Sequence, residues 1–224
     1  MQIPLARRIL EANDEAAEEL RKRFAEHRLP VVNLMGSPGA GKTSLVEETL
    51  RRTSGRLRIG VIEGDIATSL DADRIARFGA PVVQINTGGI CHLDARMISE
   101  ALESLDISAL DILLIENVGN LVCPAQFDLG ETYRVAVCSL PEGDDKVAKY
   151  PEIFSLVDAV VLNKLDLREH LRFDLSLFGR SLRELNPDAD LMEVSCSTGD
   201  GCEKWIEWLE QRLEQVRGGD GASP

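Results

Sequence analysis

The sequence predicts an α/β fold, a mainly parallel sheet flanked by helices, from two observations. Apolar runs of strand length recur along the chain, and most of them are divided by segments with helical spacing. This alternation is typical of parallel strands joined by helices that lie on both faces of a sheet. Polar motifs also follow several of the runs directly, and ligands of such sheets bind where the strands end. At 224 residues, the chain is long enough for one well-buried domain.

The first expected element is an amphipathic helix over roughly residues 5–28, because apolar residues recur there at helical intervals between charged ones. We expect this amino-terminal segment, residues 1–28, to pack on a domain formed by residues 29–217. Residues 218–224 are polar and glycine-rich, which predicts a disordered tail.

Strands are expected wherever a short apolar run is bounded by polar residues. These runs cover residues 29–35, 57–62, 81–85, 112–115, 133–138, 159–162 and 191–194. Residues 43–50 follow the first run with helical spacing. Residues 116–132 are predicted to form a long loop or a short hairpin.

Charge and cysteine content narrow the class of protein. A formal charge of −13 and a pI near 4.7 argue against a nucleic-acid-binding surface, which would need basic residues to neutralise phosphates. No apolar stretch approaches the 18 residues of a membrane span, and the first residues lack the apolar core of a signal peptide. The five cysteines form no even disulfide framework, so free thiols or metal ligands are favoured. We therefore expect a cytoplasmic protein with no membrane or nucleic-acid partner.

A phosphate-loop pattern, G-x-x-x-x-G-K-T, separates the first apolar run from the helical segment after it. It comprises Gly36, Ser37, Pro38, Gly39, Ala40, Gly41, Lys42 and Thr43, and Ser44 follows. In this pattern the glycines let backbone N–H groups converge on phosphates, the lysine meets the β- and γ-phosphate oxygens, and the threonine hydroxyl ligates Mg²⁺. The flanking strand and helix are the context that the pattern requires. The sequence therefore predicts a P-loop NTPase.

The N-K-x-D motif of Asn163, Lys164 and Asp166 predicts that the nucleotide is GTP or GDP. A carboxylate at Asp166 can accept hydrogen bonds from the N1–H and 2-amino groups of guanine, whereas adenine has no donor at those places. We expect Lys164 to lie along the base and Asn163 to brace the loops. Ser195 and Cys196 open a loop, S-C-S-T-G, that resembles the S-A-x-T-G loop whose backbone N–H meets guanine O6. The motifs come in GTPase order, so the domain is expected to be a G domain.

Glu116 and Gly119 stand where GTPases place D-x-x-G, whose acid serves Mg²⁺ and whose glycine N–H senses the γ-phosphate. A glutamate can still hold a magnesium-bound water, because Mg²⁺ keeps several waters in such sites. Asp65 is the candidate for orienting the attacking water or the Mg²⁺ shell, and a capping role is its alternative. The expected catalytic residues are Lys42, Asp65 and Glu116, and the expected Mg²⁺ ligands are Thr43, Asp65 and Glu116. Asn120 occupies the position of the water-orienting glutamine of Ras, which predicts slow intrinsic turnover.

Cys91, His92 and Cys123 form a candidate site for a second metal. Cys123 lies four residues after Gly119, and Cys91 and His92 are adjacent in a glycine-containing loop. Thiolate and imidazole ligands select Zn²⁺, Ni²⁺ or copper rather than Mg²⁺. Three ligands leave the shell open, and two copies of Cys91 and Cys123 meeting across a homodimer axis would close it. Because Cys123 would move with the switch, nucleotide state would alter metal affinity. The alternative is that the cysteines are small buried hydrophobic residues and His92 a surface residue.

Taken together, these motifs resemble the HypB hydrogenase maturation factors, which are nickel-insertion GTPases of the SIMIBI class. The resemblance, from about residue 5 to 215, rests on G-S-P-G-A-G-K-T, E-G-D, T-G-G-I-C-H-L-D-A, E-N-V-G-N-L-V-C-P, N-K-L-D and S-C-S-T-G-D-G. It implies a G domain that dimerises on GTP, with a Ni²⁺ or Zn²⁺ site from Cys91, His92 and Cys123. It also implies delivery of nickel to the large-subunit precursor of [NiFe] hydrogenase, with a HypA-like zinc-binding nickel chaperone as partner.

Three other functions remain open from the sequence. A urease-type accessory GTPase is the nearest, although the UreG family carries C-P-H where this chain has C-H. A metal-independent regulatory G protein would use the same nucleotide motifs and leave the cysteines without a ligand. A small-molecule kinase would have to explain a guanine-selective loop. N and S ligands favour both Ni²⁺ and Zn²⁺, so the working metal also stays open. Lys146 and Lys149 receive no firm role beyond a guess that they reach nucleotide across a dimer.

Overall fold

One sheet forms from the apolar runs of the sequence, and all of its strand pairs are parallel. The computed structural model describes residues 5–65 and 70–218. Its strands are β1 (Val31–Met35), β2 (Ile59–Asp65), β3 (Val82–Asn86), β4 (Ile112–Glu116), β5 (Tyr133–Ser139), β6 (Ala159–Asn163) and β7 (Asp190–Glu193). Their order across the sheet is β3-β2-β4-β1-β5-β6-β7. The predicted α/β fold, a mainly parallel sheet flanked by helices, is confirmed.

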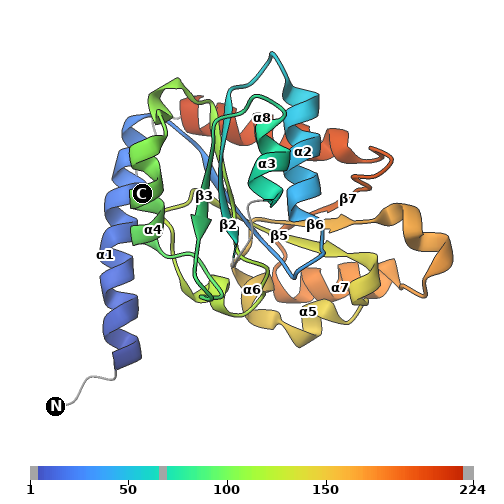
Figure 1. The fold of residues 1–224 in the computed structure, drawn as a ribbon. Coiled ribbons are helices and arrows are strands. Elements are labelled where there is room, and N and C mark those ends of the chain that lie inside the picture. The colour runs from blue at the N-terminus through green and yellow to red at the C-terminus, as the bar shows by residue number, and fades with distance from the viewer. Residues whose placement is uncertain (1–4, 66–69, 219–224) are drawn as a thin grey trace.

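Helices connect the strands and cover the sheet (Figure 1). They are α1 (Leu5–Glu26), α2 (Lys42–Thr53), α3 (Leu70–Ala76), α4 (Ala95–Ala101), α5 (Lys146–Lys149), α6 (Pro151–Leu156), α7 (Leu175–Leu185) and α8 (Cys202–Gly218). Short 3₁₀ helices lie in the loops, at Leu102–Ser104, Ile107–Ala109, Cys123–Gln126, Leu140–Glu142 and Leu165–His170. Nowhere in the described parts of the chain is a helix both long and apolar enough to cross a membrane.

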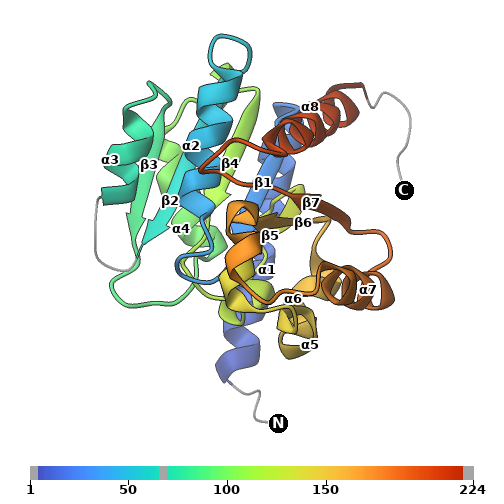
Figure 2. The ribbon, with the colours of Figure 1, turned by 90° about the vertical axis from the view of Figure 1, so that its right-hand side faces the viewer.

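Alternating side chains of the strands divide the core between the two faces of the sheet. Val32 and Leu34 of β1 pack in a cluster with α2, α3 and α8. Val31, on the other face, joins a cluster with α1 and α4. Met35 joins a third cluster with α6 and α7. Figure 2 shows α8 and α7 on opposite sides of the strands β5 to β7. Both faces are covered, which explains why the strands read as continuous apolar runs.

The amino-terminal helix α1 lies beside α4, as Figure 1 shows. It buries Ala17, Leu20 and Phe24 against the sheet. The buried Asn13 adds a polar connection, because its Nδ2 donates to the carbonyl of Asp128 at 2.8 Å and its Oδ1 accepts from the backbone N–H at the start of α4 at 2.9 Å. The helix is thus held to the domain by both apolar and polar contacts.

Two expectations about loops are refined by the structure. Residues 117–132 are all described and contain no strand, so the stretch is a long loop and the hairpin alternative is wrong. Asn120 in this loop makes an isolated antiparallel bridge with Gly36. The expected disordered tail lies outside the described residues except for Gly218, which ends α8.

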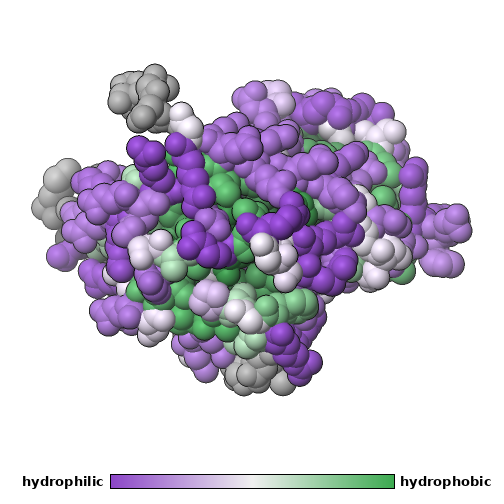
Figure 3. Space-filling view, turned by 90° about the horizontal axis from the view of Figure 1, so that it is seen from above, coloured by the Kyte–Doolittle hydropathy of each residue, from purple (hydrophilic) through white to green (hydrophobic). Residues whose placement is uncertain are grey.

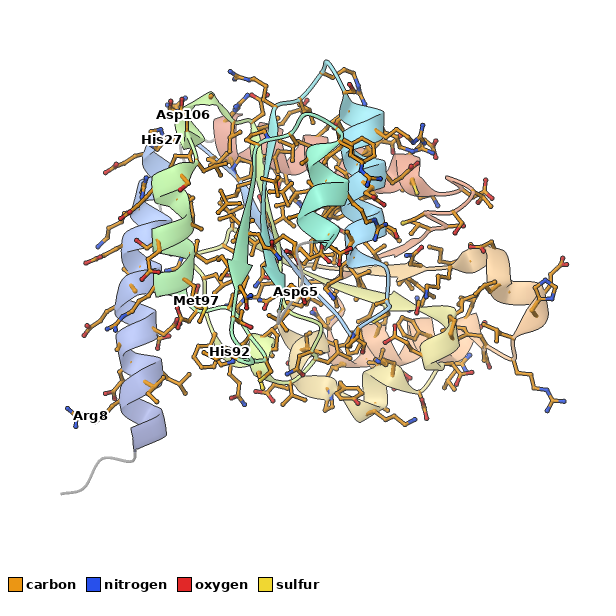
Figure 4. All side chains as sticks on the ribbon, in the orientation of Figure 1. Arg8, His27, Asp65, His92, Met97 and Asp106 are labelled. Carbon is orange, nitrogen blue, oxygen red and sulfur yellow. The ribbon has the colours of Figure 1, made fainter. Side chains whose placement is uncertain are left out.

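Since all strands point the same way, their carboxyl ends share one edge of the sheet. In Figure 4, Asp65 and His92 lie at this edge, whereas His27 and Asp106 lie at the opposite one. Figure 3 views the molecule from that opposite side, where hydrophilic residues cover most of the margin and hydrophobic residues show in the middle. The predicted motifs are therefore gathered at the carboxyl edge, where open parallel sheets bind ligands.

Candidate functional site

The phosphate loop runs from the end of β1 into α2. Gly41 precedes α2 with a φ of +99°, a left-handed conformation that suits glycine. A Cβ at this position would lie 2.2 Å from Nδ2 of Asn163, so no larger residue fits without movement. Gly41 gives α2 no side-chain cap, and its first N–H groups are therefore available to an anion.

Two buried lysines reach this loop from different elements. Lys42 donates from Nζ to the carbonyl oxygens of Gly36 at 3.2 Å and Ser37 at 3.4 Å. Burial lowers the pKa of Lys42, and neighbouring carboxylates oppose the shift. Lys146, the first residue of α5, donates to Ser37 Oγ at 2.8 Å and to Glu142 Oε1 at 2.5 Å. Lys146, for which the sequence predicts no firm role, thus contacts the phosphate loop of its own chain.

A cavity of about 440 Å³ beside the loop is lined by carboxylates from neighbouring strands. Glu63 of β2 and Glu116 of β4 are register partners and are only 2% and 5% exposed. Thr43 Oγ1 donates to Glu116 Oε1 at 2.7 Å. The Oε2 atoms of both glutamates are buried and have no hydrogen-bond partner. Asp65, half-buried at the end of β2, lines the same cavity.

These carboxyl groups fit a magnesium ion. Burial raises the pKa of Glu63 to about 8, and the charge of Glu116 adds to the effect. Burial also raises the pKa of Glu116 to about 7, although Lys42 and the hydroxyl of Thr43 favour its ionised form. Hard oxygen donors that are buried and unpartnered suit Mg²⁺, whose charge would favour the ionised carboxylates. The candidate ligands are Thr43, Asp65, Glu116 and, beyond the prediction, Glu63.

Asn163 joins the loops of the predicted guanine site. Its Nδ2 donates to the carbonyl of Ala40 at 3.2 Å. Its Oδ1 accepts from the backbone N–H of Cys196 at 3.1 Å and of Lys164 at 2.7 Å. Lys164 adds a bond from Nζ to the carbonyl of Gly39 at 2.7 Å. One buried amide therefore fixes the phosphate loop, the N-K-x-D loop and the S-C-S-T-G loop relative to one another.

Asp166 and the last loop complete this corner of the site. Asp166 is exposed, and its Oδ1 accepts from the hydroxyl of the buried Ser195 at 2.5 Å. A hollow of about 380 Å³ lies between these loops and α2. It is lined by Gly41, Ser44, Glu47, Glu48, Arg51, Phe78, Asn163, Lys164, Cys196 and Ser197. The hollow and the 440 Å³ cavity share Gly41, Ser44 and Lys164, as a nucleotide spanning both would require. A larger groove of about 580 Å³ between α1 and α4 lies apart from these residues.

Cys91, His92 and Cys123 also come together at the carboxyl edge. Their candidate ligand atoms all lie within 4.8 Å of one another, and all three residues are half-buried. Cys91 Sγ is 2.9 Å from Cys123 Sγ and 3.9 Å from His92 Nδ1. The His92 ring stacks on Phe127, with centroids 3.8 Å apart, which fixes the plane of the imidazole.

Burial and the contact between the two thiols affect the protonation of this group. The hydrogen bond with Cys91, followed by burial, raises the pKa of the Cys123 thiol, and burial lowers the pKa of His92. A metal ion would therefore meet a neutral imidazole and displace a thiol proton. Two sulfurs and one nitrogen form a soft, incomplete ligand set that suits Ni²⁺ or Zn²⁺ rather than Mg²⁺.

The structure places the predicted nucleotide residues around two adjoining hollows, although Asp166 and Ser195 line neither of them. It brings the predicted thiol and imidazole ligands together in a separate group. The sequence analysis missed Glu63. A signal was present, because Glu63 lies two residues before Asp65 and so points to the same face of its strand. What the sequence could not show is that Glu116 is its register partner.

Comparisons with known proteins point to one family. Residues 30–193 match the family model described as CobW/HypB/UreG, nucleotide-binding domain. The hydrogenase maturation factor HypB of Escherichia coli K12 is 48% identical over 202 residues, which span 90% of this chain and 70% of that protein.

Two solved structures are similar along nearly the whole chain. The crystal structure of HypB from Archaeoglobus fulgidus has a TM-score of 0.85 and 43% identity, and covers 91% of this chain and 99% of its own. The crystal structure of HypB from Helicobacter pylori in complex with nickel has a TM-score of 0.87 and 37% identity, and covers 95% of this chain and 99% of its own.

Proposed function

This chain belongs to the HypB family of hydrogenase maturation factors, and from that premise we propose that it is a GTP-hydrolysing nickel metallochaperone. It would help to insert nickel into the large-subunit precursor of [NiFe] hydrogenase in the cytoplasm, together with a HypA-like zinc-binding chaperone. The observation that carries the proposal is the convergence of Cys91, His92 and Cys123 at the loop that follows Glu116 and Gly119. A phosphate loop alone would support nucleotide hydrolysis, whereas soft ligands beside it support metal handling.

The nucleotide half of the site supports hydrolysis of GTP. Lys42 and the first N–H groups of α2 would bind the phosphates, and Thr43, Asp65 and Glu116 would hold Mg²⁺. Mg²⁺ in such a site neutralises charge that develops on the phosphates. Asp166 would select guanine by accepting from its N1–H and 2-amino groups.

Slow intrinsic turnover is part of the proposal. Asn120 follows Gly119, where the Ras class has a water-orienting glutamine. Its amide donates to the carbonyl of Cys91 at 3.3 Å, and its Oδ1 accepts from the backbone N–H of Val122 at 3.0 Å. A side chain engaged on the side of the metal loop is poorly placed to orient water at a phosphate.

Nickel is the proposed cargo of the thiol and imidazole site. The HypB of Helicobacter pylori has been crystallised with nickel, and the ligand set here is of the kind that binds this ion. Three protein ligands leave the shell open for transfer, or for closure by a second copy of the chain in a GTP-bound homodimer. Zn²⁺ satisfies the same ligands and is the competing ion.

The decisive experiment measures Ni²⁺ and Zn²⁺ binding to the metal-free protein without nucleotide, with GDP, and with a non-hydrolysable GTP analogue. Molecular mass is followed in the same samples by light scattering. We expect about one metal per chain or per dimer, an affinity that depends on nucleotide, and loss of at least tenfold in affinity in Cys123→Ala. Cys138→Ala, which removes a fully buried cysteine of β5, is the matched control.

If the protein binds GTP tightly and Cys123→Ala leaves metal binding unchanged, the protein is a metal-independent G protein instead. The recipient of nickel is tested in cells by deleting the gene and measuring hydrogenase and urease with and without added nickel. Loss of hydrogenase that returns with nickel supports the proposal, whereas loss of urease alone would assign the protein to urease maturation.

A further inference from the structure

Asn120 joins the two segments that carry Cys91 and Cys123. Its Nδ2 donates to the carbonyl oxygen of Cys91 at 3.3 Å. Its Oδ1 accepts from the N–H of Val122 at 3.0 Å, which closes a local turn directly before Cys123. One amide therefore sets the position of two ligands that come from loops far apart in the sequence.

The backbone on either side of that amide is fixed to the phosphate loop. Asn120 forms an antiparallel bridge with Gly36, the first residue of the loop. Gly119 lies against Pro38, where an added Cβ would be 2.9 Å from Pro38 Cγ and 3.1 Å from its N and Cα. A displacement of the phosphate loop would therefore be passed to residues 119 and 120 by direct contact.

A second asparagine, Asn117, links the same two segments in a different way. Its Oδ1 accepts from the N–H of Leu93 at 3.2 Å, and its Nδ2 donates to Asn33 Oδ1 at 3.2 Å. Asn117 is 1% exposed, and Asn33 lies within β1, so this connection is anchored in the sheet. Asn120 is only half-buried and is anchored in the phosphate loop. Asn117 itself lines the 440 Å³ cavity, whereas Asn120 lies outside that lining and is bridged to the phosphate loop. A movement of the phosphate loop would therefore displace the link through Asn120.

We propose that Asn120 is a positioning residue that couples occupancy of the phosphate loop to the geometry of the nickel ligands Cys91 and Cys123. This inference rests on the proposed function, because it concerns how the nucleotide and metal sites of that function communicate. A γ-phosphate that draws in Gly119 moves the backbone of Asn120, and its amide changes the separation of the two cysteines. Partners outside the ligand shell commonly alter metal affinity by about 10–100-fold when they are removed.

The test is a nickel titration of the full chain at nucleotide concentrations that saturate each variant, once with GDP and once with a non-hydrolysable GTP analogue. Binding of Ni²⁺ is followed by thiolate-to-nickel charge-transfer absorbance. The quantity of interest is the ratio of the two nickel affinities within each variant. Asn120→Ala removes the whole amide, and Asn120→Asp keeps the acceptor for Val122 while it removes the donor to Cys91. Gln126→Ala, an exposed amide in the same 3₁₀ helix as Cys123, is the matched control.

We expect a ratio of about fivefold or more in the wild-type protein and in Gln126→Ala, the range of ordinary coupling between sites. In Asn120→Ala and Asn120→Asp the ratio should fall to within about twofold of unity, while each variant still binds nickel. A wild-type ratio retained in Asn120→Asp would overturn the inference and leave the proposed function standing. Absence of any nucleotide effect in the wild-type protein would remove the proposed coupling and the inference together.

Discussion

Asp166 shows how one carboxylate can decide which nucleotide binds. Its Oδ1 is held by the Ser195 hydroxyl at 2.5 Å, and Ser195 lies in the loop that Asn163 fixes through Cys196. The acid is therefore oriented before any base arrives. A guanine edge offers it two donors, whereas adenine would leave it without a partner. Because an unpaired polar group costs free energy when a base covers it, the carboxylate would exclude adenine as well as bind guanine in the proposed function.

Removing this carboxylate should weaken GTP binding and should strengthen ATP binding, because adenine would no longer leave a carboxylate unpaired. Two hydrogen bonds to a charged acceptor are each worth about 1.5–3 kcal/mol, so Asp166→Ala should lower GTP affinity by at least about a hundredfold. Competition of GTP and ATP against a fluorescent GDP analogue measures both affinities. Asp188→Ala, at an exposed position before β7, is the control. An equal loss for the two nucleotides would mean that Asp166 acts only by holding its loop.

The pairing of β2 with β4 brings two acidic side chains together, and the electrostatic effect of this pair is absent from either strand alone. Glu63 of β2 and Glu116 of β4 face each other in register at the carboxyl edge, and both are buried. Burial, and after it the charge of Glu116, disfavours the ionised form of Glu63, so a cation held at this corner would stabilise it. The electrostatic preference of this site for a cation thus arises from the pairing of β2 with β4 and not from either residue alone.

The pH dependence of stability in the nucleotide-free and magnesium-free protein should report this pair. Glu63 has a pKa of about 8 in the folded chain and about 4.5 when unfolded. Between those values the folded state holds the proton and the unfolded state does not, so stability should fall as pH rises from about 4.5 to 8. Glu63→Gln should reduce this fall by about 3 kcal/mol between pH 5 and pH 8.

Urea unfolding at pH 5 and pH 8 in the presence of a chelator measures the effect. Glu100→Gln, at an exposed position of α4, should leave the pH dependence as it is in the wild-type protein. Equal slopes in Glu63→Gln and the wild-type protein would show that the carboxyl group is solvated and does not carry the shift.

The order of the strands in the sheet is the part of the fold that could not be predicted from the sequence. Strands coincide with the apolar runs because a strand that is buried on both faces must be apolar along its length. The phosphate-loop and N-K-x-D motifs were readable because their chemistry lies within a few consecutive residues. Strand order is not encoded in periodicity, so the pairing of β2 with β4, and with it the role of Glu63, could not be foreseen. The hydrogen bond of Asn120 with Cys91 could not be foreseen either, because the two residues lie in separate loops.

The whole molecule carries a charge of −13, which bears on the proposed homodimer. Two such chains, with centres about 40 Å apart for domains of this size, repel each other by about 5 kcal/mol at 0.01 M salt. At 0.15 M salt the same repulsion is nearly abolished, because the Debye length falls to about 8 Å. Any dimer interface must overcome this repulsion, which the nucleotide phosphates increase.

Dimerisation with a GTP analogue and Ni²⁺ should therefore strengthen as salt is added. We expect the dimer dissociation constant to be at least about tenfold lower at 0.15 M than at 0.01 M salt. Sedimentation velocity over a range of protein concentrations measures it, with the GDP-bound protein as the monomer reference. A dimer that weakens with salt would indicate an interface held mainly by exposed ion pairs.

The central place of β1 has a consequence for how the chain is made. Its hydrogen-bonded neighbours are β4 and β5, and β5 begins about a hundred residues after β1 ends. At about 5–20 residues per second, a ribosome needs about 5–20 s to make that stretch. Until then the phosphate loop at the end of β1 lacks one of the two strands that frame it. Cys91 and Cys123 are therefore synthesised before β5, and so before the phosphate loop has both of its neighbouring strands.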